Sequence, residues 1–287
     1  MKLLVDIGNS RIKWAFGIAG QFVAQGEASG DIEASLGVML ESGHVPEEIR
    51  IANVAGADAG VRIAATLHKR FGIKPVFAGS AAVGAGIRNG YRDPGQLGVD
   101  RWLALCGAFC RYKAGICVVD AGTATTLDLV TIGGEHKGGL ILPGIALMQQ
   151  ALFRGTGNLA RLSASAELGQ EDRTFPAVGM AGGQVEARIV LGQETAAAIR
   201  YGALQATACL ARQCMEELCA EPSAEASPGV LVLTGGAAPA LHAALLRLGG
   251  FQVAGVGRGY RLEHRHQLVL EGLALDPPCF SRLPDDR

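Results

Sequence analysis

A carboxylate, a glycine turn, a hydroxyl and an ammonium group stand close together near the start of the chain. The segment reads DIGNSRIK and runs from Asp6 to Lys13, with Gly8 and Ser10 between them. Successive backbone amides in such a turn form a concave anion site, and glycine lets the backbone approach a phosphate closely. Asp6 could hold Mg²⁺ directly or through water, and Lys13 could neutralise charge on a transferred group. Taken alone, the segment also fits an ordinary hairpin with a solvated lysine.

A second Asp-Gly turn, in the segment DAGTATTLD, supports phosphate binding. Asp120 ends an apolar run, and Gly122 and Thr123 follow it. Thr123 could offer its amide and its hydroxyl to a phosphate, and Asp120 could bind a metal ion or order the loop. Two similar turns, one from each half of the chain, can hold a nucleotide from both sides of a cleft. For this turn alone, a plain hairpin remains an alternative.

The segment LTGGAAPAL is a third glycine turn. Gly235 and Gly236 follow an apolar strand and precede a predicted helix. Close approach of a flat ring or a phosphate explains these glycines, and tight packing of the strand against the helix explains them nearly as well.

The segment LGVDRW places an acid and a base side by side where a helix is expected to begin. Transfer of a phosphoryl group to an alcohol needs a carboxylate that receives the alcohol proton, and Asp100 suits that role. The dipole of the helix favours the ionised carboxylate at this end, and Arg101 could pair with an anionic substrate group in bidentate geometry. A helix cap beside a surface arginine explains the pair equally well without the accompanying loops.

The elements that must position these residues follow a mixed α/β order. The spacing of apolar residues and the glycine turns predict a β-meander over 2–28, helices over 31–42 and 61–72, and strands over 49–56 and 74–80. Further along the chain we expect a helix over 100–115, three strands over 116–144, helices over 145–153 and 194–219, a strand and helix from 229, a strand over 251–257 and a closing helix within 264–275. The stretch that ends near 191 is expected to be irregular.

The segments LLVDIGNSRIKWAFG and CVVDAGTATTLDLV form an internal repeat at the scale of a domain. We therefore predict two similar α/β domains, 1–115 and 116–287, each with a mixed sheet flanked by helices. A nucleotide cleft between them is expected.

Composition limits the possible functions. The chain has 287 residues, a net charge of −1 and scattered Lys and Arg, which argue against nucleic acid as a partner. The N-terminal apolar run is broken by Asp6 and is too short for a signal or a membrane span, so we expect a cytoplasmic protein that makes no membrane contact. Its seven cysteines are expected to be reduced and mostly buried, and its histidines show no metal-ligand spacing.

The order of DIGNSRIK, LGVDRW, DAGTATTLD, GGLILPG and LTGGAA resembles the acetate and sugar kinase, heat-shock chaperone and actin superfamily. Within it, the combination is similar to type III pantothenate kinases, over nearly the whole chain. The resemblance implies two actin-like, ribonuclease H-like domains. It also implies ATP-dependent phosphorylation of pantothenate to 4′-phosphopantothenate, the first step of coenzyme A biosynthesis, with ATP as donor, Mg²⁺, and a monovalent cation, K⁺ or NH₄⁺.

Residue roles carry over from the family where its motifs match. The resemblance implies Asp100 as general base, Asp120 as ligand of the monovalent cation and Asp6 as the Mg²⁺ contact. The implied ATP-binding residues are Asp6, Ile7, Gly8, Asn9, Ser10, Arg11, Ile12, Lys13 and Thr123. The implied pantothenate-binding residues are Tyr91, Gly98, Val99, Asp100, Arg101 and Thr195.

Two positions depart from the family pattern. Ser10 stands where Thr is common and keeps the hydroxyl, whereas Glu194 stands where Asn usually precedes the Thr, which weakens the role of Thr195. The family is typically dimeric, and the Ala-rich helix around Thr195 is the expected interface element.

Two other functions remain open from sequence. One is a regulatory or accessory protein that binds nucleotide without catalysis, which an Asp100→Asn protein with full cellular function would support. The other is a kinase of a different small alcohol such as a sugar, which substrate profiling would reveal.

Overall fold

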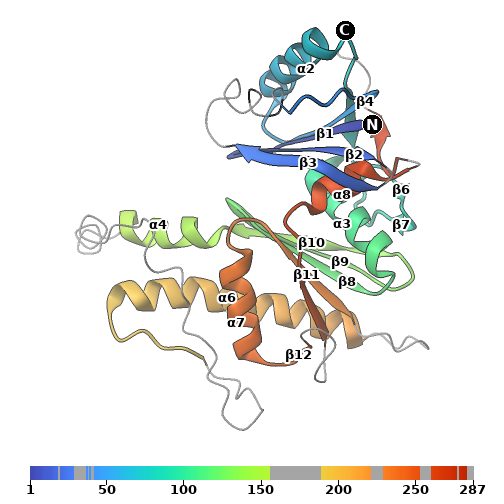
Figure 1. The fold of residues 1–287 in the computed structure, drawn as a ribbon. Helices are drawn as coiled ribbons and strands as arrows, with labels where there is room; N and C mark the ends of the chain where they lie inside the picture. Colours follow the sequence, from blue (N-terminus) through green and yellow to red (C-terminus); the bar gives the residue numbers. More distant parts are fainter. Residues whose placement is uncertain are drawn as a thin grey trace. The chain divides into compact units, whose positions relative to one another are not determined.

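The computed structural model describes residues 1–18, 20–28, 37, 39, 42–155, 189–220, 229–252, 260–276 and 278–282. The chain divides into two compact units (Figure 1). Unit 1 comprises Met1–Lys113, Gly133–Gly138 and Gln267–Arg287, and unit 2 comprises Ala114–Ile132 and Gly139–His266.

Unit 1 is built on a six-stranded sheet in the order β14-β5-β4-β1-β2-β3. Its strands are β1 (Lys2–Ile7), β2 (Ile12–Ile18), β3 (Gln21–Ala28), β4 (Glu48–Asn53), β5 (Val76–Gly79) and β14 (Ser281–Arg282). β1 pairs antiparallel with β2 and parallel with β4, so the sheet is mixed. Leu3, Leu4 and Val5 are all fully buried, because β1 is covered on both faces.

Helices cover both faces of this sheet. α2 (Ala57–Phe71) contributes Ile63 and Leu67 to the core with β1 and β4. α3 (Val99–Tyr112) and α8 (Leu268–Ala274) pack against each other, and α8 also contacts β1 and β2. A Cβ added to Gly272 would lie 2.0 Å from the carbonyl oxygen of Leu103, so α3 and α8 approach closely only because this position is glycine.

A short ribbon and a single turn lead into α3. β6 (Val83–Gly84) pairs antiparallel with β7 (Ile87–Arg88), and the 3₁₀ turn η1 (Pro94–Gln96) precedes the helix. The Asp93 carboxylate accepts the Gly95 N–H at 3.1 Å and fixes that turn. This arrangement places the start of α3 beside the loop that carries Tyr91.

Unit 2 repeats the sheet order of unit 1. Its order is β10-β9-β8-β11-β13-β12. The strands are β8 (Ile116–Ala121), β9 (Ala124–Val130), β10 (His136–Pro143), β11 (Val230–Thr234), β12 (Phe251–Gln252) and β13 (Tyr260–His264). β8 pairs antiparallel with β9 and parallel with β11, as β1 does with β2 and β4. The repeat seen in the sequence is therefore a repeat of topology.

Long helices pack on the second sheet. α6 (Thr195–Ala220) and α7 (Ala238–Leu248) share a core with β8 and β11, and α4 (Ile145–Gly155) lies beside α6 (Figure 1). The Gln205 amide of α6 accepts the Val190 N–H at 2.6 Å and donates to the Val190 carbonyl at 2.8 Å. These two bonds tie the chain before α6 to the helix.

The predicted α/β class, with two mixed sheets flanked by helices, is confirmed. Four strands were not predicted: the short β6, β7 and β14, and β13 in the charged segment YRLEH, which pairs parallel with β11. The closing helix begins only at Leu268. The predicted helix over 31–42, apart from Gly37, Met39 and Ser42, and the irregular stretch over 156–188 lie outside the described residues.

The two units do not follow a single cut in the chain. The first segment of unit 1 ends at Lys113, near the expected boundary, but 133–138 and 267–287 also group with unit 1. The C-terminal segment does so because α8 packs on α3. The domains 1–115 and 116–287 stay a prediction. None of the helices in the described ranges is long and apolar enough to cross a membrane.

Candidate functional site

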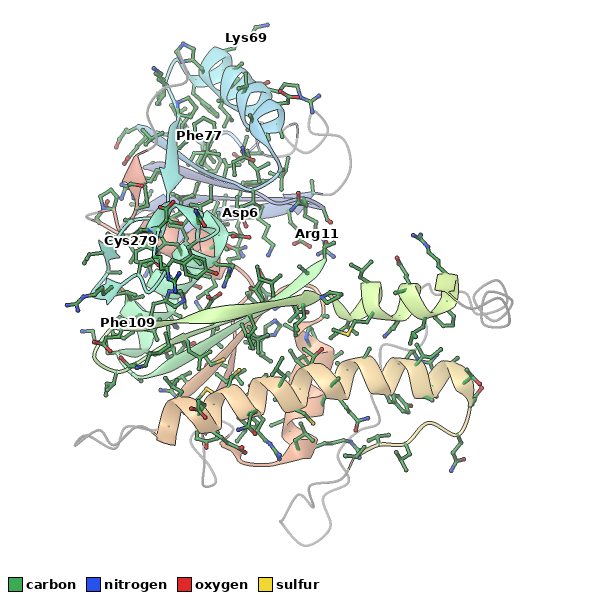
Figure 2. All side chains as sticks on the ribbon, turned by 180° about the vertical axis from the view of Figure 1, so that it is seen from behind. Asp6, Arg11, Lys69, Phe77, Phe109 and Cys279 are labelled. Carbon is green, nitrogen blue, oxygen red and sulfur yellow. The ribbon has the colours of Figure 1, made fainter. Side chains whose placement is uncertain are left out.

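The first glycine turn joins β1 to β2. Asp6 pairs directly with Lys13 across the two strands, and the Gly8 N–H donates to the Arg11 carbonyl at 3.0 Å to close the loop. Figure 2 shows Asp6 on the strand and Arg11 in the loop beyond it. Asp6 is 9% exposed, whereas Asn9, Ser10 and Arg11 are exposed. A carboxylate and an ammonium group therefore flank a loop whose tip is open to a ligand.

The start of α3 carries Asp100 as its second residue. The Asp100 Oδ1 accepts the Arg101 N–H at 2.8 Å, and Gly98 occupies the N-cap position without a side-chain bond. A Cβ on Gly98 would lie 2.6 Å from Asp100 Oδ1, so glycine makes room for the carboxylate. The positive end of the helix dipole stabilises the ionised carboxylate here. Asp100 is not the N-cap residue, although it bonds to the first turn.

Arg101 and Tyr91 lie together, as two predicted substrate contacts should. The Arg101 Nη1 donates to the Tyr91 hydroxyl at 2.9 Å, and the guanidinium carbon lies 5.6 Å from the centre of the Tyr91 ring. Arg101 is only 8% exposed, so it is not the surface arginine of the alternative interpretation. Unit 1 thus brings together Tyr91, Gly98, Val99, Asp100 and Arg101.

Sequence reasoning missed two residues around this cluster. His136 stacks on Tyr91 with 5.9 Å between ring centres and 9° between ring planes. The Asn89 side chain accepts the Tyr91 N–H at 3.0 Å and donates to the Ala81 and Pro94 carbonyls. Asn89 in the segment RNGYRDP is a typical turn residue and could have been noticed. His136 is far from Tyr91 in sequence and gave no local signal.

The second glycine turn joins β8 to β9 in unit 2. Asp120 pairs with Thr126 across the strands, and Gly122 and Thr123 are exposed. The Gly122 N–H donates to the Ala124 carbonyl at 3.1 Å, and the Gly144 N–H donates to the Thr123 carbonyl at 2.9 Å. The turn is therefore held by backbone bonds and presents Thr123 at its tip.

Gly235, in the third glycine turn, packs against Asp120. Its φ is +89°, and an added Cβ would lie 2.4 Å from Asp120 Oδ1 and 2.6 Å from the Ala121 carbonyl oxygen. The Ala237 N–H donates to that Ala121 carbonyl at 3.0 Å. Close packing of this turn against the end of β8 accounts for Gly235, and the exposed Gly236 remains available to a ligand.

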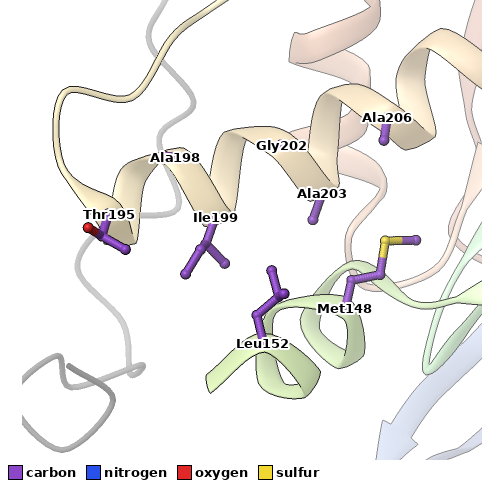
Figure 3. A pocket seen from close by; sticks show the side chains of 8 residues that line it. All are labelled: Met148, Leu152, Thr195, Ala198, Ile199, Gly202, Ala203 and Ala206. Atoms are coloured by element: carbon purple, nitrogen blue, oxygen red, sulfur yellow. The ribbon is translucent and has the colours of Figure 1, made fainter. Parts of the chain in front are cut away.

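Thr195 lies in unit 2, in a different surrounding from the other predicted substrate contacts. It is the first residue of α6 and lines a pocket of about 510 Å³ between α4 and α6. Figure 3 shows Met148 and Leu152 of α4 opposite Ile199 and Ala203 of α6. The lining is almost wholly apolar, with the Thr195 hydroxyl at one end. Its contact with a substrate stays a prediction.

Most cysteines are buried, as expected. Cys106, Cys117, Cys214 and Cys279 are buried, and burial raises the pKa of the Cys117 thiol well above its ordinary value. A thiol in this state is a poor nucleophile. Cys279 differs, because a hydrogen bond with the Cys106 side chain lowers the pKa of its thiol.

Comparisons with known proteins agree with the arrangement of these motifs. A type III pantothenate kinase from Nitrosococcus oceani is 34% identical over 283 residues, which cover 96% of this chain and 92% of that protein. Two solved structures share the fold at a TM-score of 0.50. One, from Campylobacter jejuni and assigned to the Baf family of transcriptional activators, is 20% identical and covers 94% of each chain. The other, from Sinorhizobium meliloti and assigned as a 2-dehydro-3-deoxygalactonokinase, is 17% identical and covers 96% of this chain and 97% of that one.

The family model adds the extent of the match. It is described as type III pantothenate kinase and matches residues 2–217, which include both Asp-Gly hairpins and the start of α3. The chain belongs to the type III pantothenate kinase family.

Proposed function

We propose that this protein transfers the terminal phosphoryl group of ATP to the hydroxyl of pantothenate and forms 4′-phosphopantothenate, the first step of coenzyme A biosynthesis. The observation that carries the proposal is the cluster at the start of α3. A carboxylate, Asp100, stands next to a buried guanidinium, Arg101, whose Nη1 donates to the Tyr91 hydroxyl. Pantothenate has an alcohol for the first group and a carboxylate for the second.

In the proposed step, Asp100 accepts a hydrogen bond from the pantothenate hydroxyl and then takes its proton. The alcohol oxygen forms a bond to the terminal phosphorus of ATP while the bond to the ADP oxygen breaks. Arg101 binds the pantothenate carboxylate, with Tyr91, Gly98 and Val99 around it, and so orients the hydroxyl. Lys13 neutralises the charge on the transferred group.

The loop from Asp6 to Lys13 and Thr123 are the proposed ATP contacts, through backbone amides, hydroxyls and the Lys13 ammonium group. Mg²⁺ commonly uses one or two protein carboxylates together with phosphate oxygens and water. Across the described ranges, no cluster of three or more His, Cys, Asp or Glu could hold a metal ion. A single carboxylate at Asp6, beside the phosphate loop, fits an ion held mainly by ATP, and such an ion would neutralise phosphate charge.

Asp120 is the proposed ligand of the monovalent cation, K⁺ or NH₄⁺. Gly235 lies so close to Asp120 Oδ1 that a Cβ there would be only 2.4 Å away. This packing holds the carboxylate at the end of β8, on the side where the Ala121 carbonyl oxygen also lies close to Gly235. A large, weakly hydrated cation suits such a set of oxygens.

We also infer a homodimer, as the family resemblance implies. The pocket between α4 and α6 is apolar, and Leu147 and Leu152 on α4 are 45% and 47% exposed. Apolar side chains of this kind mark an interaction surface. We place the enzyme in the cytoplasm, where ATP is available. Sedimentation that gives only monomer under conditions of turnover would remove the dimer.

Product analysis tests the proposed function. Purified protein is incubated with ATP, Mg²⁺, K⁺ and pantothenate, and the products are identified by mass spectrometry. We expect 4′-phosphopantothenate and ADP in equal amounts, and a large loss of rate when Na⁺ replaces K⁺. Consumption of ATP with a sugar but not with pantothenate would identify a different kinase, and no ATP consumption with either would overturn the assignment.

A further inference from the structure

Tyr91 is held by contacts on its ring, its hydroxyl and its backbone. His136 stacks on the ring at 5.9 Å, Arg101 Nη1 donates to the hydroxyl at 2.9 Å, and Asn89 accepts the Tyr91 N–H at 3.0 Å. Only the first of these partners comes from a distant part of the sequence, and no function assigned above uses it. His136 is 3% exposed, so its polar ring is buried at this place.

The turn before β10 brings His136 to Tyr91. The Arg88 N–H donates to the Gly134 carbonyl at 2.8 Å, and the backbones of Arg88 and Glu135 form an isolated parallel β-bridge. A Cβ on Gly90 would lie 1.9 Å from the His136 carbonyl oxygen, so the two backbones touch where glycine permits it. The Gly90 N–H also donates to His136 Nδ1 at 3.4 Å. Backbone contacts thus fix His136, and its Nδ1 accepts a backbone N–H.

We propose that His136 is a positioning residue that acts through Tyr91 to hold the Arg101 guanidinium ready for the carboxylate of the substrate. The inference rests on the proposed function, because it assigns the anion to Arg101. Arginine has many side-chain rotamers, and a binding site gains affinity when these are restricted before the ligand arrives. A parallel ring on one side of Tyr91 and a hydrogen bond at its hydroxyl provide that restriction.

If His136 only filled space in the core, different results would be expected. An apolar residue would fill a buried space equally well, without an imidazole whose Nδ1 accepts a backbone N–H. The His136 ring stacks flat on the ring of Tyr91, and the Tyr91 hydroxyl accepts a hydrogen bond from Arg101. Loss of His136 should therefore affect the substrate that carries the carboxylate and leave the nucleotide alone.

The experiment compares His136→Ala, His136→Leu and His136→Phe with wild type. KM for pantothenate, KM for ATP, kcat and the melting temperature are measured for each. We expect Ala and Leu to raise KM for pantothenate about threefold to tenfold, as the loss of one aromatic pair predicts, with little change in KM for ATP or kcat. Phe keeps a stacking ring and should restore KM for pantothenate to within about twofold of wild type.

His44→Ala is the matched control, because His44 also contacts an aromatic ring in unit 1, that of Phe16 at 5.1 Å. It should leave both KM values unchanged. In a Tyr91→Ala background, His136→Ala should add no further change, since the proposed path runs through Tyr91. If His136→Ala fails to fold, the Leu and Phe pair decides the question.

Three results would overturn the inference. They are an unchanged KM for pantothenate in Ala and Leu, a parallel rise in both KM values, and equal losses in Leu and Phe. If wild type does not phosphorylate pantothenate, the proposed function fails on its own. Crystal structures of wild type and His136→Leu then still decide the positioning: a displaced Arg101 side chain in the variant supports it, and an unchanged one contradicts it.

Discussion

The hairpin at Asp6 and the hairpin at Asp120 occupy the same place in two sheets of the same order. In both, the aspartate is the second-last residue of the central strand. Across the strands, however, Asp6 faces Lys13, whereas Asp120 faces Thr126. The loop of the first hairpin spans Gly8 to Arg11, whereas only Gly122 and Thr123 join β8 to β9.

The packing around the two turns differs more than their sequences. Gly144 and Gly235 both touch the second turn so closely that an added Cβ would lie within 2.4 Å of its atoms. At the first turn, a Cβ on Gly8 would lie 3.1 Å from its nearest neighbour, the Arg11 carbonyl oxygen. The first hairpin thus has an open loop and the positively charged Lys13. The turn of the second hairpin is instead fixed by the residues packed around it. We infer that the first hairpin neutralises charge and the second holds position.

Replacement of Lys13, the positively charged residue of the first hairpin, should have the largest effect. Lys13→Ala removes charge neutralisation from the transferred group and should lower kcat about 100-fold to 1000-fold. Thr126→Ala, at the matching position of the second hairpin, should change kcat less than about threefold. Steady-state kinetics with ATP and pantothenate measure both. Similar losses in the two variants would contradict the division of roles.

Adding a methyl group beside each turn should separate the two by stability. A Cβ at position 144 would lie 2.3 Å from the Gly122 carbonyl oxygen and 2.4 Å from that of Thr123, so backbone must move. Gly144→Ala should lower the free energy of unfolding by about 2–3 kcal/mol, and Gly8→Ala by about 1 kcal/mol or less. Urea denaturation followed by circular dichroism compares them. A variant Gly144→Ala as stable as wild type would show that the second turn yields easily.

As the pH falls, unit 2 should lose stability before unit 1. This is the smallest of the expected effects. Burial, and then His266 and His242, lower the pKa of His264 at the end of β13. The folded state therefore favours neutral His264, so its stabilisation is complete above about pH 6.5 and declines as the pH falls further. Because His264 is only partly buried and solvent screens its charge, we expect about half a kcal/mol or less between pH 7.5 and 5.

Asp276 in unit 1 provides the contrast. Hydrogen bonds from Lys2 and Arg50 lower the pKa of its carboxyl, so the stabilisation it gives is present above about pH 3.8 and lost below that value. In His264→Gln, the urea midpoints of unfolding at pH 7.5 and at pH 5 should become nearly equal. In Asp276→Asn, the difference between the two midpoints should stay as in wild type. The reverse result would assign the acid sensitivity to unit 1.

The sequence predicted the elements that carry Asp6, Asp100 and Asp120, because each aspartate ends an apolar strand or begins an amphipathic helix. Local patterns of this kind depend on residues that are neighbours in sequence. The alternative that Arg101 is a surface charge could be rejected only once its burial was known. Local sequence patterns could not predict the distances between residues in the two halves of the chain.

The parts that were missed depend on long-range contacts. The strand YRLEH has three residues with acidic or basic side chains and no apolar run, and only its pairing with β11 and β12 makes it a strand. The last helix joins unit 1 because Gly272 admits the backbone of α3 at Leu103, which no local pattern reveals. His136 reaches Tyr91 through a turn of the other half of the sequence.

The central claim is that Asp100 takes the proton of the alcohol during phosphoryl transfer, and Asp100→Asn tests it most directly. The amide keeps the shape of the side chain and an oxygen for the Arg101 N–H but cannot accept the proton. Rates of 4′-phosphopantothenate formation are measured at saturating substrates, with ATP affinity measured separately. We predict a loss of kcat of about 100-fold or more with unchanged ATP binding. A kcat for Asp100→Asn within a few-fold of wild type would contradict the account.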